Sequence, residues 1–96
     1  MPSNQVLLHE MDVAIKQFDA GRLSFRGLLD RLVDCVDNLA NPDPVWEDAF
    51  RRAWGRMEDS YAFAASEGLK AIRDIDMPAI ELALKEIRRL VAQKIA

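Results

Sequence analysis

The feature of this 96-residue chain that most limits its fold is the spacing of its apolar residues, which recur every three or four positions in four separate runs. This spacing gathers them on one side of an α-helix, whereas a half-buried strand requires strict alternation. The period predicts helices over residues 4–20, 25–40, 44–66 and 77–95. Because short turns favour antiparallel neighbours, we expect an all-α, up-down bundle of about four helices.

Capping residues support these boundaries. Gly21 follows the first run and can end its helix in the left-handed conformation. Ser24 is a good N-cap for the second helix. Asp43 followed by Pro44 begins the third, because proline at the first helical position needs no partner for an N–H group. Gly55 lies inside the third helix, where glycine costs about 1 kcal/mol relative to alanine, so its expected role is a close helix contact or a slight kink.

The connection to the fourth helix is less regular. Gly68 is predicted to end the third helix and Asp76 to cap the fourth, with Pro78 tolerated in its first turn. Between them, the sequence leaves open whether residues 67–76 form a loop or a helical segment that turns its aliphatic side chains into the bundle.

Length and composition fit one helical domain over residues 1–96, large enough for a single core. No signal peptide and no apolar run of membrane-spanning length is present, which predicts a cytoplasmic protein that makes no membrane contact. Cys35 is the only cysteine, so no disulfide framework exists, and its place on the inner side of the second helix predicts a small core residue.

Charge is divided unevenly along the chain. The net charge is -3, but residues 1–50 carry nine acids against four bases, and residues 51–96 carry seven acids against nine bases. An acidic first half repels phosphate backbones and favours basic partners. We therefore expect a protein partner with a basic surface and no nucleic acid.

Residues that carry chemistry are scarce. His9 is the only histidine, and no Glu-x-x-His pair, Gly-rich phosphate loop or nucleophile–base set can be assembled. Adjacent acids such as Glu47 and Asp48 point about 100° apart on a helix and cannot share one reacting centre. The sequence thus predicts no catalytic residue, metal or cofactor, and a protein that is not an enzyme.

Aromatic residues of the third helix share one helical face, at Trp46, Phe50, Trp54 and Tyr61, and this spacing favours the core over a binding surface. Glu58 lies at the edge of that face. It is predicted to hydrogen-bond a buried polar tip, with a partner contact as the alternative.

An acidic stripe on the second helix is the main candidate for a binding surface. Asp30, Asp34 and Asp37 lie at i, i+4 and i+7. Arg26 and Arg31 offset part of this charge and leave Asp37 without a partner at the usual spacing. The stripe is either a solvated face or a docking surface for a basic protein, since such charge steers association. Glu47 and Asp48 of the third helix, which precede Arg51 and Arg52 by four positions, are added to these three aspartates. The candidate partner-binding residues are therefore Asp30, Asp34, Asp37, Glu47 and Asp48.

Capping and core residues between positions 21 and 62 also carry a family resemblance. They are Gly21-Arg22-Leu23-Ser24-Phe25, Leu28, Leu32, Leu39, Asp43, Trp46, Phe50, Trp54, Met57-Glu58 and Tyr61-Ala62. This segment resembles small helical bacterial immunity proteins of the colicin-like and contact-dependent growth inhibition kind. The resemblance implies a non-enzymatic cytoplasmic inhibitor that covers the active or substrate-binding surface of one cognate toxin. If that toxin is a nuclease, an acidic face would take the place of nucleic-acid phosphates.

A second class of function stays open at this point. A helical adaptor or structural interaction module, homodimeric through exposed aromatic residues of the third helix, fits the same composition.

Overall fold

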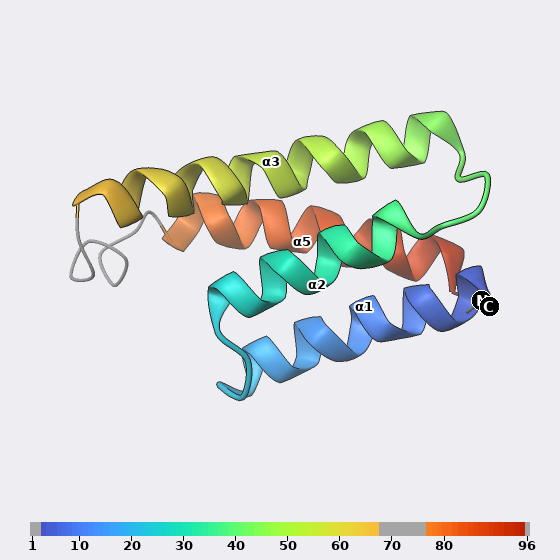
Figure 1. Ribbon diagram of the computed structural model, residues 1–96, viewed down its shortest axis with the longest axis horizontal. Helices are drawn as coiled ribbons and strands as arrows, with labels where there is room; N and C mark the ends of the chain where they lie inside the picture. Colours follow the sequence, from blue (N-terminus) through green and yellow to red (C-terminus); the bar gives the residue numbers. More distant parts are fainter. Residues whose placement is uncertain (1–2, 68–76, 96) are drawn as a thin grey trace.

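The computed structural model describes residues 3–67 and 77–95, and these residues form helices, with no strand among them. Short turns over residues 20–24 and 38–43 join the first three helices. The helices are α1 (Asn4–Asp19), α2 (Phe25–Asp37), α3 (Pro44–Glu67) and α5 (Met77–Lys94) (Figure 1). The all-α prediction is confirmed. The largest difference in a boundary is at the end of α2, which stops at Asp37 rather than at residue 40.

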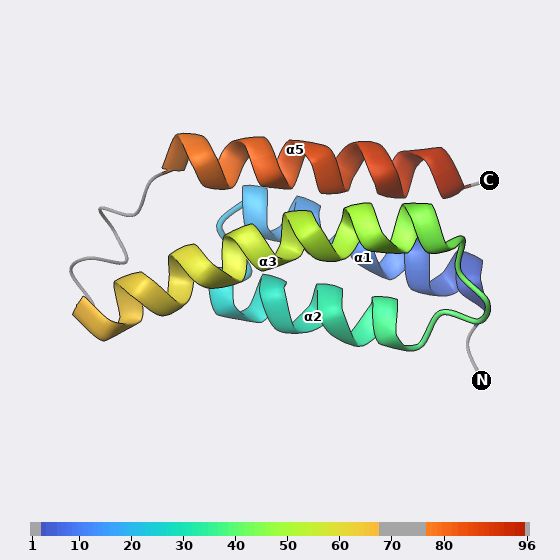
Figure 2. The ribbon, with the colours of Figure 1, turned by 90° about the horizontal axis from the view of Figure 1, so that it is seen from above.

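The helices run up and down and surround one core. α1 packs against α2, α2 against α3, α3 against α5, and α5 against α1, so that α2 and α5 lie across a diagonal (Figure 2). α1 begins and α5 ends at the same end of the bundle (Figure 1). Within the described residues, no helix is both long and apolar enough to cross a bilayer.

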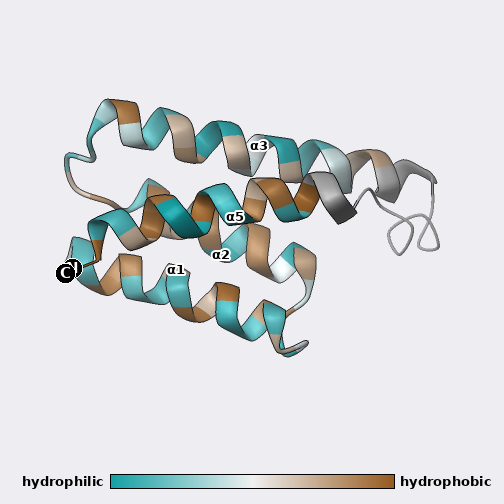
Figure 3. Ribbon diagram, turned by 180° about the vertical axis from the view of Figure 1, so that it is seen from behind, coloured by the Kyte–Doolittle hydropathy of each residue, from teal (hydrophilic) through white to brown (hydrophobic). Residues whose placement is uncertain are grey.

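Every helix contributes to the core through its apolar stripe, so that apolar and polar segments alternate along each ribbon (Figure 3). The largest side chains with no exposed surface include Phe50, Met11, Leu28, Met57 and Ile87. They come from all four helices, which means that no helix buries its apolar face without the other three.

The predicted caps at Ser24, Asp43 and Gly21 are confirmed. The Ser24 hydroxyl accepts a hydrogen bond from the Gly27 N–H at 3.0 Å, and the Asp43 carboxylate accepts one from the Val45 N–H at 3.0 Å. Gly21 has a φ of 75°, the left-handed conformation expected after α1.

The remaining predictions concern Gly55 and the connection between α3 and α5. At Gly55 a Cβ would meet nothing within 4 Å, so the close helix contact predicted there is wrong. Of residues 67–76, for which the sequence left loop or helix open, Glu67 is the last residue of α3, and the others, with the predicted roles of Gly68 and Asp76, lie outside the described residues.

Candidate protein-binding surface

The five predicted partner-binding acids lie on two adjacent helices, Asp30, Asp34 and Asp37 on α2 and Glu47 and Asp48 on α3. Four of the five are exposed, and Glu47 is half-buried. Two arginines form ion pairs between these helices, Arg26 of α2 with α3 and Arg51 of α3 with α2. We call the resulting strip of charged side chains the acidic seam. It consists of Arg26, Asp30, Asp34 and Asp37 of α2 and Glu47, Arg51 and Glu58 of α3.

At one end of the acidic seam, Arg51 connects the two helices. Its Nη2 lies 2.9 Å from an oxygen of Asp37 on α2 and 3.0 Å from an oxygen of Glu47 on its own helix. The pKa of Arg51 is raised, first by the hydrogen bond to Asp37. The structure thus brings Asp37 and Glu47 to one guanidinium group, although they come from different helices.

At the other end, Arg26 makes the same kind of bridge in the opposite direction. Its Nε donates to Asp30 on its own helix at 3.0 Å, and its Nη1 donates to Glu58 on α3 at 3.0 Å. The pKa of Arg26 is raised, chiefly by the hydrogen bond to Asp30. Glu58 was expected to bond a polar aromatic tip. That prediction is wrong: the Glu58 carboxylate pairs with Arg26, and the Trp54 indole donates to the Leu29 carbonyl.

Asp34 lies between these two bridges and differs from its neighbours. Among the described residues, no lysine or arginine forms an ion pair with its carboxylate, whereas its backbone carbonyl accepts a hydrogen bond from Asn38 at 2.7 Å. Its carboxylate therefore has unused hydrogen-bonding capacity at the middle of the acidic seam.

The charge of the acidic seam remains negative after its internal pairs are counted. Five carboxylates and two guanidinium groups leave a net charge of -3. Asp48 is not part of this arrangement, because it pairs with Arg52 one turn further along α3, at 3.0 Å. This pair follows from the spacing of four residues along α3, and it does not involve α2.

The aromatic face of α3 is mainly internal, as its spacing predicted. Trp46 and Phe50 are 5% and 0% exposed, and Trp54 and Tyr61 are half-buried. Phe63, which lies outside the predicted aromatic face, is 71% exposed. A dimer interface built from exposed aromatic side chains of α3 would therefore have only Phe63 as a largely exposed ring within the described residues.

Metal-ligating and thiol side chains are the next candidates for chemistry in the part of the chain that the structure describes. No cluster of three or more His, Cys, Asp or Glu residues there could hold a metal ion. Cys35 is buried in the core, as predicted, with its thiol 3.8 Å from a carboxylate oxygen of Glu10. Burial raises the pKa of the Cys35 thiol to about 11, so at neutral pH the nucleophilic thiolate is nearly absent.

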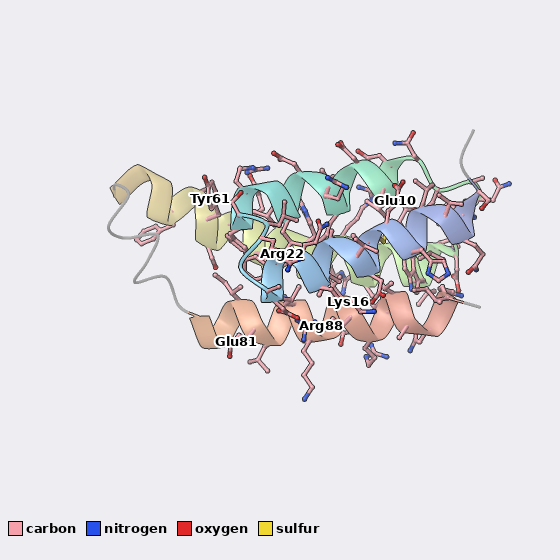
Figure 4. The ribbon with its side chains drawn as sticks, turned by 90° about the horizontal axis from the view of Figure 1, so that it is seen from below. Glu10, Lys16, Arg22, Tyr61, Glu81 and Arg88 are labelled. Carbon is pink, nitrogen blue, oxygen red and sulfur yellow. The ribbon has the colours of Figure 1, made fainter. Side chains whose placement is uncertain are left out.

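A hollow of about 540 Å³ lies between α1 and α5, floored by Phe18, Ile80 and Leu84. Arg88 reaches from α5 toward the end of α1 on this side (Figure 4) and pairs with Asp19. Two of the charged side chains that line the hollow, Arg88 and Asp19, are thus engaged with each other.

No family model, curated protein or solved structure matches this chain.

Proposed function

We propose that this protein is a non-enzymatic inhibitor that binds a cognate bacterial toxin domain through the acidic seam. The observation that carries the proposal is the charge of -3 that remains on the acidic seam after Arg26 and Arg51 have made their pairs. The resemblance of residues 21–62 to helical immunity proteins supplies the class of partner. The proposal places the protein in the cytoplasm, without a cofactor.

The arginine bridges favour binding as well as structure. Side chains that are ordered before association lose less conformational entropy when a partner docks, and this raises affinity. Arg26 and Arg51 each fix two carboxylates in place. A basic partner therefore meets a row of oriented acceptors, and the field of the acidic seam steers its approach. If the toxin is a nuclease, the acidic seam would occupy the groove that holds substrate phosphates.

Asp34 gives the sharpest test, because reversing its charge breaks no ion pair within the described protein. We expect Asp34→Lys to weaken binding to the toxin domain about tenfold or more, mainly through slower association, and to leave the melting temperature unchanged. The binding partner to be tested is the C-terminal domain of any large secreted protein that is found to be encoded directly upstream of this chain's gene. Calorimetry and binding kinetics at low and raised salt provide the measurement.

Glu81→Lys is the matched control. Glu81 is exposed on α5, across the diagonal from α2, and the substitution makes the same change in net charge. Wild-type affinity is expected for this variant. Equal loss in both variants would show that only total charge matters, and equal affinity of Asp34→Lys and wild type would remove the acidic seam from the interface. A chain that neither binds the neighbouring domain nor protects cells from it is not an immunity protein.

A homodimeric adaptor is the second candidate, and the 71% exposure of Phe63 and Leu82 is the observation that favours it. Sedimentation over a range of concentrations tests it. A concentration-dependent dimer that Leu82→Gln abolishes would support the adaptor, and a monomer at all concentrations would contradict it.

A further inference from the structure

An aromatic cluster continues the acidic seam beyond Arg26, at the end of the bundle where α1 turns into α2. The ring of Phe25 lies 5.8 Å from that of Phe18 on α1 and 5.8 Å from that of Tyr61 on α3, between centroids. The guanidinium carbon of Arg26 lies over the Tyr61 ring, 5.3 Å from its centroid. Figure 4 shows Tyr61 beside the first turn of α2.

Tyr61 is held from two sides and yet remains half-exposed. Phe25 packs against its ring, and Arg26 covers the ring while Asp30 and Glu58 fix the guanidinium group. These carboxylates also neutralise Arg26, so this end of the acidic seam does not repel a cation. Within the described residues, the Tyr61 hydroxyl has no hydrogen-bond partner. A rigid aromatic residue with an unused polar tip is typical of the anchor residues at protein interfaces, because little entropy is lost when it is bound.

We propose that Tyr61 is an anchor of the partner-binding surface, where it receives a lysine or arginine side chain of a basic partner. The Tyr61 hydroxyl accepts a hydrogen bond from the partner's cation, and the ring packs against the aliphatic stem of that side chain. Tyr61 thereby extends the row of acceptors formed by Asp37, Asp34 and Asp30. This inference rests on the proposed function, since it requires that cationic side chains dock along the acidic seam.

An octalysine peptide is the probe for a direct test, because it presents cations without any other recognition element. It is titrated into the ¹⁵N-labelled full-length protein at low salt, and amide shifts are followed. We expect shifts at Asp30, Asp34 and Tyr61, which raised salt reverses. Amide shifts along α2 without a shift at Tyr61 would overturn the role of Tyr61 as an anchor and would retain the acidic seam as the binding surface. Shifts confined to other acids, such as Asp12 or Glu81, would overturn the acidic seam itself, and the anchor with it.

Tyr61→Phe then isolates the hydroxyl group, because it retains the ring and its packing. We expect the Kd for octalysine to rise about fivefold, the effect of one hydrogen bond, with an unchanged melting temperature. Ser60→Ala is the control, since the Ser60 hydroxyl is already used in a hydrogen bond to the Arg56 carbonyl at 3.0 Å. It should bind like wild type. A wild-type Kd for Tyr61→Phe, beside a weakened Asp34→Lys, would overturn the anchor alone.

Discussion

At the scale of single residues, the arginines of the acidic seam matter more for orientation than for stability. Exposed ion pairs contribute about 0–1 kcal/mol each, because water and salt screen them. A guanidinium group, however, presents five donors in a fixed plane and can hold two carboxylates at once. Arg51 does so for Asp37 and Glu47. Only the Glu47 pair follows from sequence spacing, since the Asp37 pair depends on how two helices are rotated against each other.

Cys35 is a residue whose burial has a measurable effect on pH dependence. Its pKa is raised from an ordinary value of 9.0 to about 11, first by burial and then by Glu10. The unfolded thiol therefore ionises at a lower pH than the folded one. The stabilisation is fully present below pH ~9 and is lost as the pH rises toward ~11, by about 2 kcal/mol.

The prediction is checked by denaturant unfolding of the wild type and Cys35→Ala between pH ~8 and ~11. The unfolding free energy of the wild type should fall more steeply with pH than that of the variant, which lacks the thiol. Parallel curves for the two proteins would contradict a raised thiol pKa.

At the scale of the helices, the sequence predicts those features that depend on interactions between residues close together in the chain. The apolar period and the caps Ser24 and Asp43 act within a few residues of each other, so the starts of α2 and α3 were predicted correctly. The end of α2 was placed too late. The helix ends at Asn38, whose side-chain amide donates a hydrogen bond to the Asp34 backbone carbonyl, and the proline that follows Asn41 does not set this boundary. The interhelix partner of Glu58 required the tertiary arrangement, which no spacing along one helix contains.

Substitutions at two glycines separate the effect of helix propensity on stability from the effect of left-handed backbone strain. At both Gly21 and Gly55 an added Cβ would meet nothing within 4 Å, so steric clash with other residues does not contribute at either position. Gly55→Ala should raise the unfolding free energy by about 0.5–1 kcal/mol, because alanine favours the helix interior. Gly21→Ala should lower it by about 1 kcal/mol, because alanine is strained at the φ of 75° found there. Chemical denaturation checks both, and changes of the same sign would contradict the assignment.

At the scale of the whole molecule, the bundle separates its charges across a diagonal. α2 and its contacts with α3 carry the acidic seam, whereas α5 bears four bases against two acids. In the described structure, no Cα atom of α2 lies within 8 Å of a Cα atom of α5. A charged partner therefore meets opposite potentials on opposite sides, which orients the bundle during encounter as well as attracting it.

The ring of helices is closed at the end where α1 begins. The side-chain amide of Asn4 donates to the Ala40 carbonyl and accepts from the Ala40 N–H, both at 2.8 Å. Gln5 donates to the Lys94 carbonyl at 2.8 Å, and the Trp46 indole donates to the Leu90 carbonyl at 2.8 Å. The first turn of α1 thus ties the α2–α3 turn to the end of α5.

Because these contacts join segments far apart in sequence, removing Asn4 should loosen this end of the molecule as a unit. We expect Asn4→Ala to lower the unfolding free energy by about 1–2 kcal/mol, since two hydrogen bonds are lost. The Ala40 backbone amide should also exchange its hydrogen faster, because the hydrogen bond to the Asn4 side chain that protects it is absent in the variant. Asn38→Ala is the matched control: its hydrogen bond to Asp34 lies within one helix end, so the Ala40 amide should keep its protection. If Ala40 exchanges equally slowly in wild type and Asn4→Ala, the packing of α1 and α5 holds this end closed without the Asn4 side chain.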